Sequence, residues 1–171
     1  MSECLDTITS QIHHATAGTY HLPIETSVKV LLTNRADSSG RILLLQEPGG
    51  RYHFPGGVAT PTEQPKDTLK RELGEETPFS LDTLVIDDQL EYSCSWPGKF
   101  GNKIVGIFFI CSIDTPVEAL EQQLDTKLSA EEHISRVLAN PRTACEDYNM
   151  VSSSDEIIAA YLNAITPEVV H

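Results

Sequence analysis

Three glutamates in one short segment have the spacing that most clearly points to chemistry. From Gly57 to Phe79 the chain reads GVATPTEQPKDTLKRELGEETPF, and Glu72, Glu75 and Glu76 are separated by three and four positions. On a helix this spacing places three carboxylates within an arc of about 100°. Because like charges so close repel one another, the spacing predicts a positive charge between them. A hard divalent cation, which prefers oxygen ligands, meets that need.

The glutamates need a helix to position them, and the sequence predicts one over Pro65 to Glu76. Proline suits the first turn, Leu69 and Leu73 lie one turn apart on an apolar side, and Pro78 closes the helix. The acidic residues interact unfavourably with the helix dipole, because the C-terminal end of the helix already carries partial negative charge. Taken alone, such a cluster is usually a solvated helix face, so a purely structural helix is an alternative.

The spacing of the whole segment resembles the Nudix box, G-x5-E-x7-R-E-U-x-E-E-x-G-U, where U is a bulky apolar residue. Eight specified positions are in register: Gly57, Glu63, Arg71, Glu72, Leu73, Glu75, Glu76 and Phe79. Pro78 replaces the late glycine, so Thr77 is expected to leave the helix in an extended conformation. This departure affects the shape of the loop and removes no metal ligand.

The resemblance implies a magnesium site, in which manganese can substitute. Its ligands would be Glu72, Glu75 and Glu76, helped by the carbonyl of Gly56 in the preceding turn. Glu75 and Glu76 would also take part in catalysis.

The resemblance also implies a second layer of residues around the metal. Arg71 would orient carboxylates, above all that of Glu63. The general base would be a box glutamate or a later one. Residues 128–133 read LSAEEH, so Glu132 is the first candidate and Glu131 the second. An ordinary solvated pair is the alternative.

Three residues are candidates for contacts with substrate. Trp96 lies beside a Pro/Gly loop, where its ring could stack on a base, and Phe100 lies in that loop. Arg51 could meet a phosphate. The alternatives are a loop anchor packed on the core for Trp96 and simple surface solvation for Arg51.

The remaining segments predict an α/β protein, a Nudix-like α/β/α sandwich with a mixed β-sheet. We expect residues 1–22 to form an N-terminal lead-in and residues 23–171 a single domain. The predicted strands and helices are strands over 26–34, 41–48, 52–57, 84–96, 103–113 and 134–138, and helices over 117–123 and 155–165.

Composition limits the compartment and the partners. The chain has 171 residues and a formal charge of −13, so its mean field repels a nucleic-acid backbone. The N-terminus lacks the pattern of a signal peptide, and no apolar run approaches the ~20 residues that cross a bilayer. The four cysteines show no CxxC spacing and are read as reduced, buried thiols. We expect a cytoplasmic protein with no membrane partner; a homodimer remains open.

The leading functional hypothesis is a hydrolase that cleaves a phosphoanhydride bond in a nucleoside-diphosphate-linked small molecule. ADP-ribose, a nucleotide sugar and a nucleoside triphosphate are the substrate types considered. The alternative is a catalytically silent Nudix-like domain that binds a nucleotide or a protein.

Overall fold

Two long parallel strands form the centre of the molecule. The computed structural model describes residues 25–79, 83–86, 92–97, 103–124, 135–151 and 154–165. Strand β1 (Glu25–Asn34) runs beside β6 (Lys103–Ile113) from the Glu25–Ile104 pair to the Asn34–Ile113 pair. Both strands are rich in β-branched and aromatic residues, as expected of strands that are covered on both faces.

The other strands extend this pair into a mixed sheet. Strand β2 (Ile42–Gln46) is antiparallel to β1 and also pairs with β3 (Tyr52–His53) and β7 (Ser135–Ala139). Strands β4 (Val85–Ile86) and β5 (Tyr92–Pro97) pair antiparallel with β6. The predicted mixed sheet is therefore confirmed.

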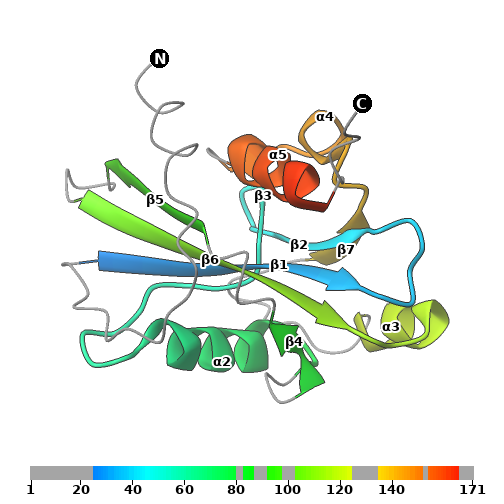
Figure 1. Cartoon of the computed structure of the whole chain (residues 1–171), viewed down its shortest axis with the longest axis horizontal. Coiled ribbons are helices and arrows are strands. Elements are labelled where there is room, and N and C mark those ends of the chain that lie inside the picture. The colour runs from blue at the N-terminus through cyan, green and yellow to red at the C-terminus, as the bar shows by residue number, and fades with distance from the viewer. Residues whose placement is uncertain are drawn as a thin grey trace, which may run out of the picture.

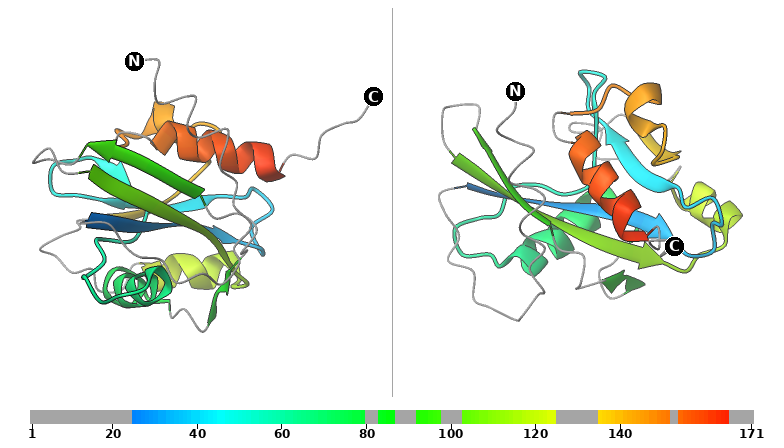
Figure 2. Two further views of the ribbon diagram at one scale, coloured as in Figure 1. Left: turned by 60° about the vertical axis from the view of Figure 1, so that its left-hand side comes forward. Right: turned by 45° about the horizontal axis from the view of Figure 1, so that its top comes forward.

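Helices cover both faces of the sheet (Figures 1 and 2). Helices α2 (Pro65–Glu76) and α3 (Val117–Leu124) lie on one side, and α4 (Ala144–Asp147) and α5 (Ser154–Ile165) lie on the other. This is the α/β/α sandwich that the sequence predicted. Within the described ranges, no helix is both long enough and apolar enough to span a lipid bilayer.

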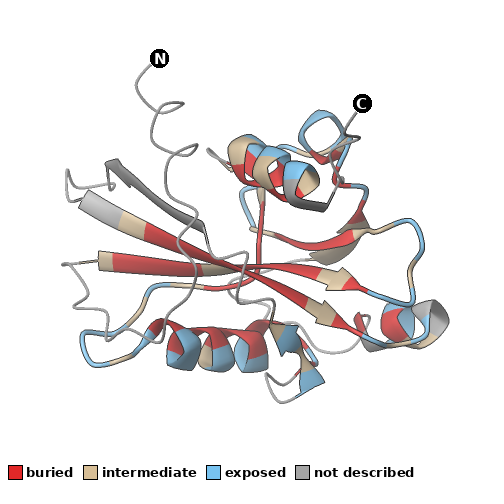
Figure 3. Ribbon diagram, viewed as in Figure 1, coloured by how far each residue is buried: buried red, intermediate tan, exposed pale blue. Residues whose placement is uncertain are grey.

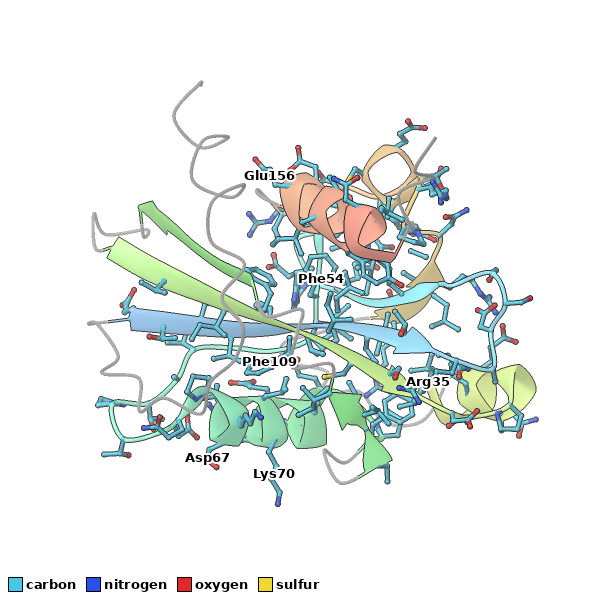
Figure 4. The ribbon with its side chains drawn as sticks, in the orientation of Figure 1. Arg35, Phe54, Asp67, Lys70, Phe109 and Glu156 are labelled. Carbon is cyan, nitrogen blue, oxygen red and sulfur yellow. The ribbon has the colours of Figure 1, made fainter. Side chains whose placement is uncertain are left out.

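The alternation of side chains along β1 and β6 creates two cores, one on each face. Figure 3 shows the buried residues concentrated along these strands and on the inner sides of the helices. Phe109 belongs to the core under α2, and Phe54 belongs to the core under α5, on the opposite side of the sheet (Figure 4). The first core contains Val28, Val30, Leu69, Leu73 and Phe79, and the second contains Leu31, Ile42, Phe108, Ile158 and Tyr161.

Helix α2 has the predicted bounds and the predicted exit. Pro65 lies in its first turn, and Thr77 follows it with φ −134° and ψ 161°. The Thr77 hydroxyl donates to the Leu73 carbonyl at 2.7 Å and accepts from the Phe79 N–H at 3.2 Å. Thr77 thus satisfies backbone groups at a helix end where proline prevents a left-handed cap.

Three predictions about elements need correction. The predicted strand over 52–57 is a strand only at Tyr52–His53. Beyond it, Pro55 and Gly57 accept hydrogen bonds from the Val30 and Val28 N–H groups, so the chain follows the edge of β1. The predicted strand over 84–96 is divided into β4 and β5, and helix α4 was not predicted because four residues are too few to show a helical period.

The cysteines agree only in part with the prediction of buried thiols. Cys111 is a buried free thiol in the core under α2. Cys145 is a free thiol at the surface of α4, so for this residue the prediction of burial is wrong. A four-residue helix buries only a narrow side of itself, and Ala144 takes that position.

Candidate active site

The site is built on a glycine bend at the edge of β1. Gly56 has a φ of 122°, and a Cβ atom added there would lie 2.1 Å from the Val28 carbonyl oxygen. A Cβ added at Gly57 would lie 2.1 Å from Oε1 of Glu72. The two glycines therefore allow the backbone to approach β1 on one side and a carboxylate of α2 on the other.

The three box glutamates differ in exposure although they share one helix. Glu72 and Glu76 are buried on the side of α2 that faces the bend, whereas the Glu75 side chain is 55% exposed. The Gly56 N–H donates to Oε2 of Glu76 at 2.6 Å. This charge-assisted hydrogen bond partly offsets the free-energy cost of burying the carboxylate. The helix thus presents two carboxylates to the bend and one to solvent.

Arg71 connects the acidic residues with one another. Its Nε and Nη2 donate to the two carboxylate oxygens of Glu63 at 2.9 and 3.2 Å. Its Nη1 donates to Glu72 Oε1 at 2.7 Å and lies 3.5 Å from Glu75 Oε2. Nη2 also donates to the Val58 carbonyl at 3.2 Å, which ties the helix to the loop after the bend.

The pairing with Arg71 sets the charge state of Glu63. The hydrogen bond from Arg71 lowers the pKa of Glu63 to about 2, with further help from the Thr60 N–H. The same hydrogen bond raises the pKa of Arg71 above its usual value. Glu63 therefore stays ionised and keeps the guanidinium fixed beside Glu72.

Lys29 reaches the same bend from β1, and the sequence reasoning missed it. Its Nζ donates to the carbonyl oxygen of Gly56. Burial lowers the pKa of Lys29, while the charges of Glu76, Glu72 and Glu47 oppose that shift. The signal that could have found it is a lysine inside the otherwise apolar run VKVLL.

Arg136 of β7 is a second missed residue. Its Nε donates to the Glu76 carbonyl at 2.9 Å, and its Nη1 donates to the Leu124 carbonyl at 3.0 Å. These are carbonyls at the C-terminal ends of α2 and α3, where a cation is favourable for the helix dipoles. Burial lowers the pKa of Arg136, and the charge of Glu76 opposes this shift.

The donor types at the bend fit magnesium, but their arrangement fits only in part. Carboxylate oxygens are the ligands that hard divalent cations prefer, and Glu72, Glu75 and Glu76 supply them. Among the described residues, however, no three acidic, histidine or cysteine side chains are gathered as in a metal site. The carbonyl of Gly56, the fourth predicted ligand, accepts a hydrogen bond from Lys29.

The predicted substrate contacts are only partly covered by the structure. Arg51 is exposed, and its guanidinium binds Glu47 Oε2 at 2.9 and 3.2 Å in the turn between β2 and β3. Trp96 lies within β5, where its backbone pairs with Ile104. Phe100 and Glu132, with Glu131, lie outside the described residues.

Comparison with solved structures supports this fold. The Ap4A hydrolase of C. elegans in a binary complex has a TM-score of 0.67 at 18% identity, over 82% of this chain and 97% of that one. The MutT protein of Methanosarcina mazei Go1 has a TM-score of 0.63 at 22% identity, over 86% of this chain and all of that one. The NUDIX domain of Shewanella oneidensis NrtR, complexed with ADP ribose, has a TM-score of 0.61 at 15% identity, over 88% and 92%.

Comparison of the sequence assigns the family. The chain has no match among curated proteins. The family model described as NUDIX domain matches residues 23–161, which include the whole segment from the glycine bend to the end of α2. With the box in register and the sandwich fold around it, the chain belongs to the Nudix family.

Proposed function

We propose that this chain is a magnesium-dependent hydrolase that cleaves a phosphoanhydride bond in a nucleoside-diphosphate-linked small molecule. One observation carries the proposal: Glu72 and Glu76 are buried carboxylates beside the Gly56–Gly57 bend. Burying ionised groups is unfavourable unless they are paired or hold a cation. The same helix carries the exposed Glu75, which lies about one turn after Glu72.

The side chains divide the work of hydrolysis. Glu72, Glu75 and Glu76 would hold magnesium, with Glu75 and Glu76 also close to the reacting groups. When bound, the ion supplies charge neutralisation on the phosphates and a more acidic water. Arg71, fixed by Glu63, holds Glu72 in place through its 2.7 Å hydrogen bond.

The proposed substrate is a small nucleoside diphosphate derivative. Similar folds occur in proteins described as an Ap4A hydrolase and as a NUDIX domain complexed with ADP ribose. A net charge of −13 disfavours long anionic polymers, which would need many compensating basic residues. Arg51, Trp96 and Phe100 remain our proposed contacts for phosphate and base.

Glu132 remains our first candidate for the general base and Glu131 the second. The segment that contains them precedes β7, and Arg136 of that strand binds the Glu76 carbonyl. The start of β7 is thus anchored at the end of the acidic helix, which supports a role for the preceding acids near the same site.

An activity assay with and without metal tests the proposal. A panel of nucleoside diphosphate derivatives, including ADP-ribose, nucleotide sugars and nucleoside triphosphates, is incubated with the chain in magnesium and then in EDTA. We expect release of phosphate or mononucleotide in magnesium only. Glu75→Gln should lower kcat at least about a hundredfold, because a metal ion contributes several kcal/mol of transition-state stabilisation. Glu146→Gln, exposed on α4, is the matched control and should be as active as wild type.

The same assay decides between hydrolysis and binding alone. The second candidate is a nucleotide-binding domain without turnover, in which Arg71 and not a metal ion is the partner of Glu72. Such a domain would bind a panel compound in isothermal titration and release no product in magnesium or manganese. That result would reject the hydrolase.

A further inference from the structure

Lys29 places its side-chain nitrogen at the backbone oxygen of Gly56, which the resemblance assigns to the metal site. Its neighbours Val28 and Val30 belong to the core under α2, so the alternation of a strand directs Lys29 to the other face of the sheet. Nζ donates to the carbonyl of Gly56, while the N–H of the same residue donates to Glu76. Gly56 is thus bound by an acidic side chain at its N–H and by a basic side chain at its carbonyl.

The surroundings of Lys29 are acidic on several sides. Burial lowers the pKa of Lys29, and the charges that oppose this shift come from Glu76 and Glu72 of α2 and from Glu47, which follows β2. Glu47 in turn binds Arg51. An ammonium among carboxylates reduces their mutual repulsion, which is the electrostatic task of a bound cation.

We propose that Lys29 is a built-in cation of this site: its ammonium holds the Gly56 carbonyl in place of a metal ion, so that the box binds fewer divalent ions than its carboxylates alone would allow. The inference deepens the proposed function and rests on it. The reason is electrostatic, because an ammonium and a divalent ion that share one carbonyl oxygen repel each other strongly in a partly buried site. Metal binding is then left to Glu72, Glu75 and Glu76 without the backbone oxygen.

Counting bound ions tests this inference without a substrate. Wild type, Lys29→Met and Lys29→Gln are titrated with Mn²⁺ alone and followed by electron paramagnetic resonance. Thermal unfolding is measured in EDTA and in saturating Mn²⁺. We expect both variants to bind one ion more than wild type, or to bind Mn²⁺ on the order of tenfold more tightly, as removal of a neighbouring like charge implies. In EDTA both should unfold at a lower temperature than wild type, and Mn²⁺ should raise their melting temperature more.

Two variants separate the charge of Lys29 from other effects. Lys29→Gln keeps an N–H donor for the carbonyl, so its agreement with Lys29→Met would assign the effect to the charge. Lys70→Met removes the same charge from the outer side of α2, where Lys70 is exposed and points away from the sheet (Figure 4). It should bind Mn²⁺ as wild type does; a gain equal to that of Lys29→Met would overturn the inference.

The remaining outcomes are also decisive. If both Lys29 variants bind as many Mn²⁺ ions as wild type does, and with the same affinity, the inference is overturned and the proposed hydrolase remains. Variants that are unfolded in EDTA support it if Mn²⁺ restores folding, and overturn it if Mn²⁺ does not. If wild type binds no Mn²⁺ and releases no product, the proposed function fails. An ion gained by Lys29→Met would then still support the role of Lys29.

Discussion

In the proposed site, Glu63 acts by holding Arg71 and not by binding the metal ion. It receives two donors from that guanidinium, one from the Thr60 N–H at 2.9 Å and one from the Thr68 hydroxyl at 3.2 Å. Planar, bidentate pairing fixes both side chains. The fork that binds Glu63 also reaches Glu72, so the orientation of a proposed metal ligand depends on an acid outside the helix.

Glu63→Gln gives a prediction about stability and pH. The folded state lowers the pKa of Glu63 from 4.5 to about 2, so its ionised form stabilises the fold above the unfolded pKa. That contribution is lost as the pH falls from about 4.5 towards about 2. We expect the free energy of unfolding of wild type to exceed that of Glu63→Gln by a constant amount between neutral pH and the unfolded pKa, and the difference to shrink below it. Urea denaturation of dilute protein at several pH values measures this difference.

Glu146→Gln provides the baseline for that series, because Glu146 is exposed on α4. The free energy of unfolding of wild type and Glu63→Gln should become more similar as the pH falls below the unfolded pKa. A difference that stays unchanged or grows would contradict the assigned role of the Arg71 pair.

At the scale of elements, α2 and the glycine bend depend on each other's shape. The bend brings Gly57 so close to Glu72 that no side chain fits between them. The helix ends at Glu76, and the hydroxyl of the next residue, Thr77, replaces a glycine cap through its hydrogen bonds to Leu73 and Phe79. The departure at Pro78 is thus accommodated within one turn, and the carboxylates keep their place on the helix.

Gly57→Ala should separate activity from stability. The new Cβ would lie 2.1 Å from Oε1 of Glu72, the mobile end of a side chain, so the carboxylate must move while the backbone stays. We expect a loss of turnover together with a change of only about 1 kcal/mol in the free energy of unfolding, since the Glu72–Arg71 pair is only partly buried and its carboxylate can move towards solvent. Steady-state kinetics and urea denaturation measure the two effects.

Gly74→Ala is the matched control on the same helix. A Cβ there meets nothing within 4 Å, so alanine should stabilise the helix by about 0.5–1 kcal/mol and leave turnover unchanged. If Gly57→Ala were as active as Gly74→Ala, the position of Glu72 would not matter for the reaction.

At the scale of the whole molecule, Arg136 joins parts that are far apart in the sequence. Its guanidinium reaches the ends of both helices on one face of the sheet from β7, which pairs with β2 along its full length. Strand β7 is therefore connected to the acidic helix through one side chain. This connection links the C-terminal end of α2 to the sheet.

Arg136→Met should weaken this connection. Two hydrogen bonds from a charged group would be lost and two helix ends would lose a cation, so we expect the free energy of unfolding to fall by about 2 kcal/mol or more. Arg142→Met, at an exposed position just before α4, should change it by less than about 0.5 kcal/mol. Equal stability of the two variants in urea denaturation would show that Arg136 does not hold the helices.

Much of the architecture could be predicted because its signals are local. The bounds of α2 follow from Pro65, Pro78 and the spacing of Leu69 and Leu73 within twelve residues. The β-branched and leucine-rich run of β1 and the apolar density of β6 made both strands recognisable. Helix α4 and the division between β4 and β5 escaped prediction, because short elements are specified by the neighbours they pack on.

The sequence by itself determined the family, the helix and the types of oxygen donor, because the box is a contiguous pattern with a fixed period. Only the tertiary structure decided which charges meet at the bend. Lys29 lies 27 positions from Gly56 and Arg136 lies 60 positions from Glu76, so their contacts arise from the pairing of strands and not from local spacing. Electrostatic energy depends on distance in space, and the fold sets that distance.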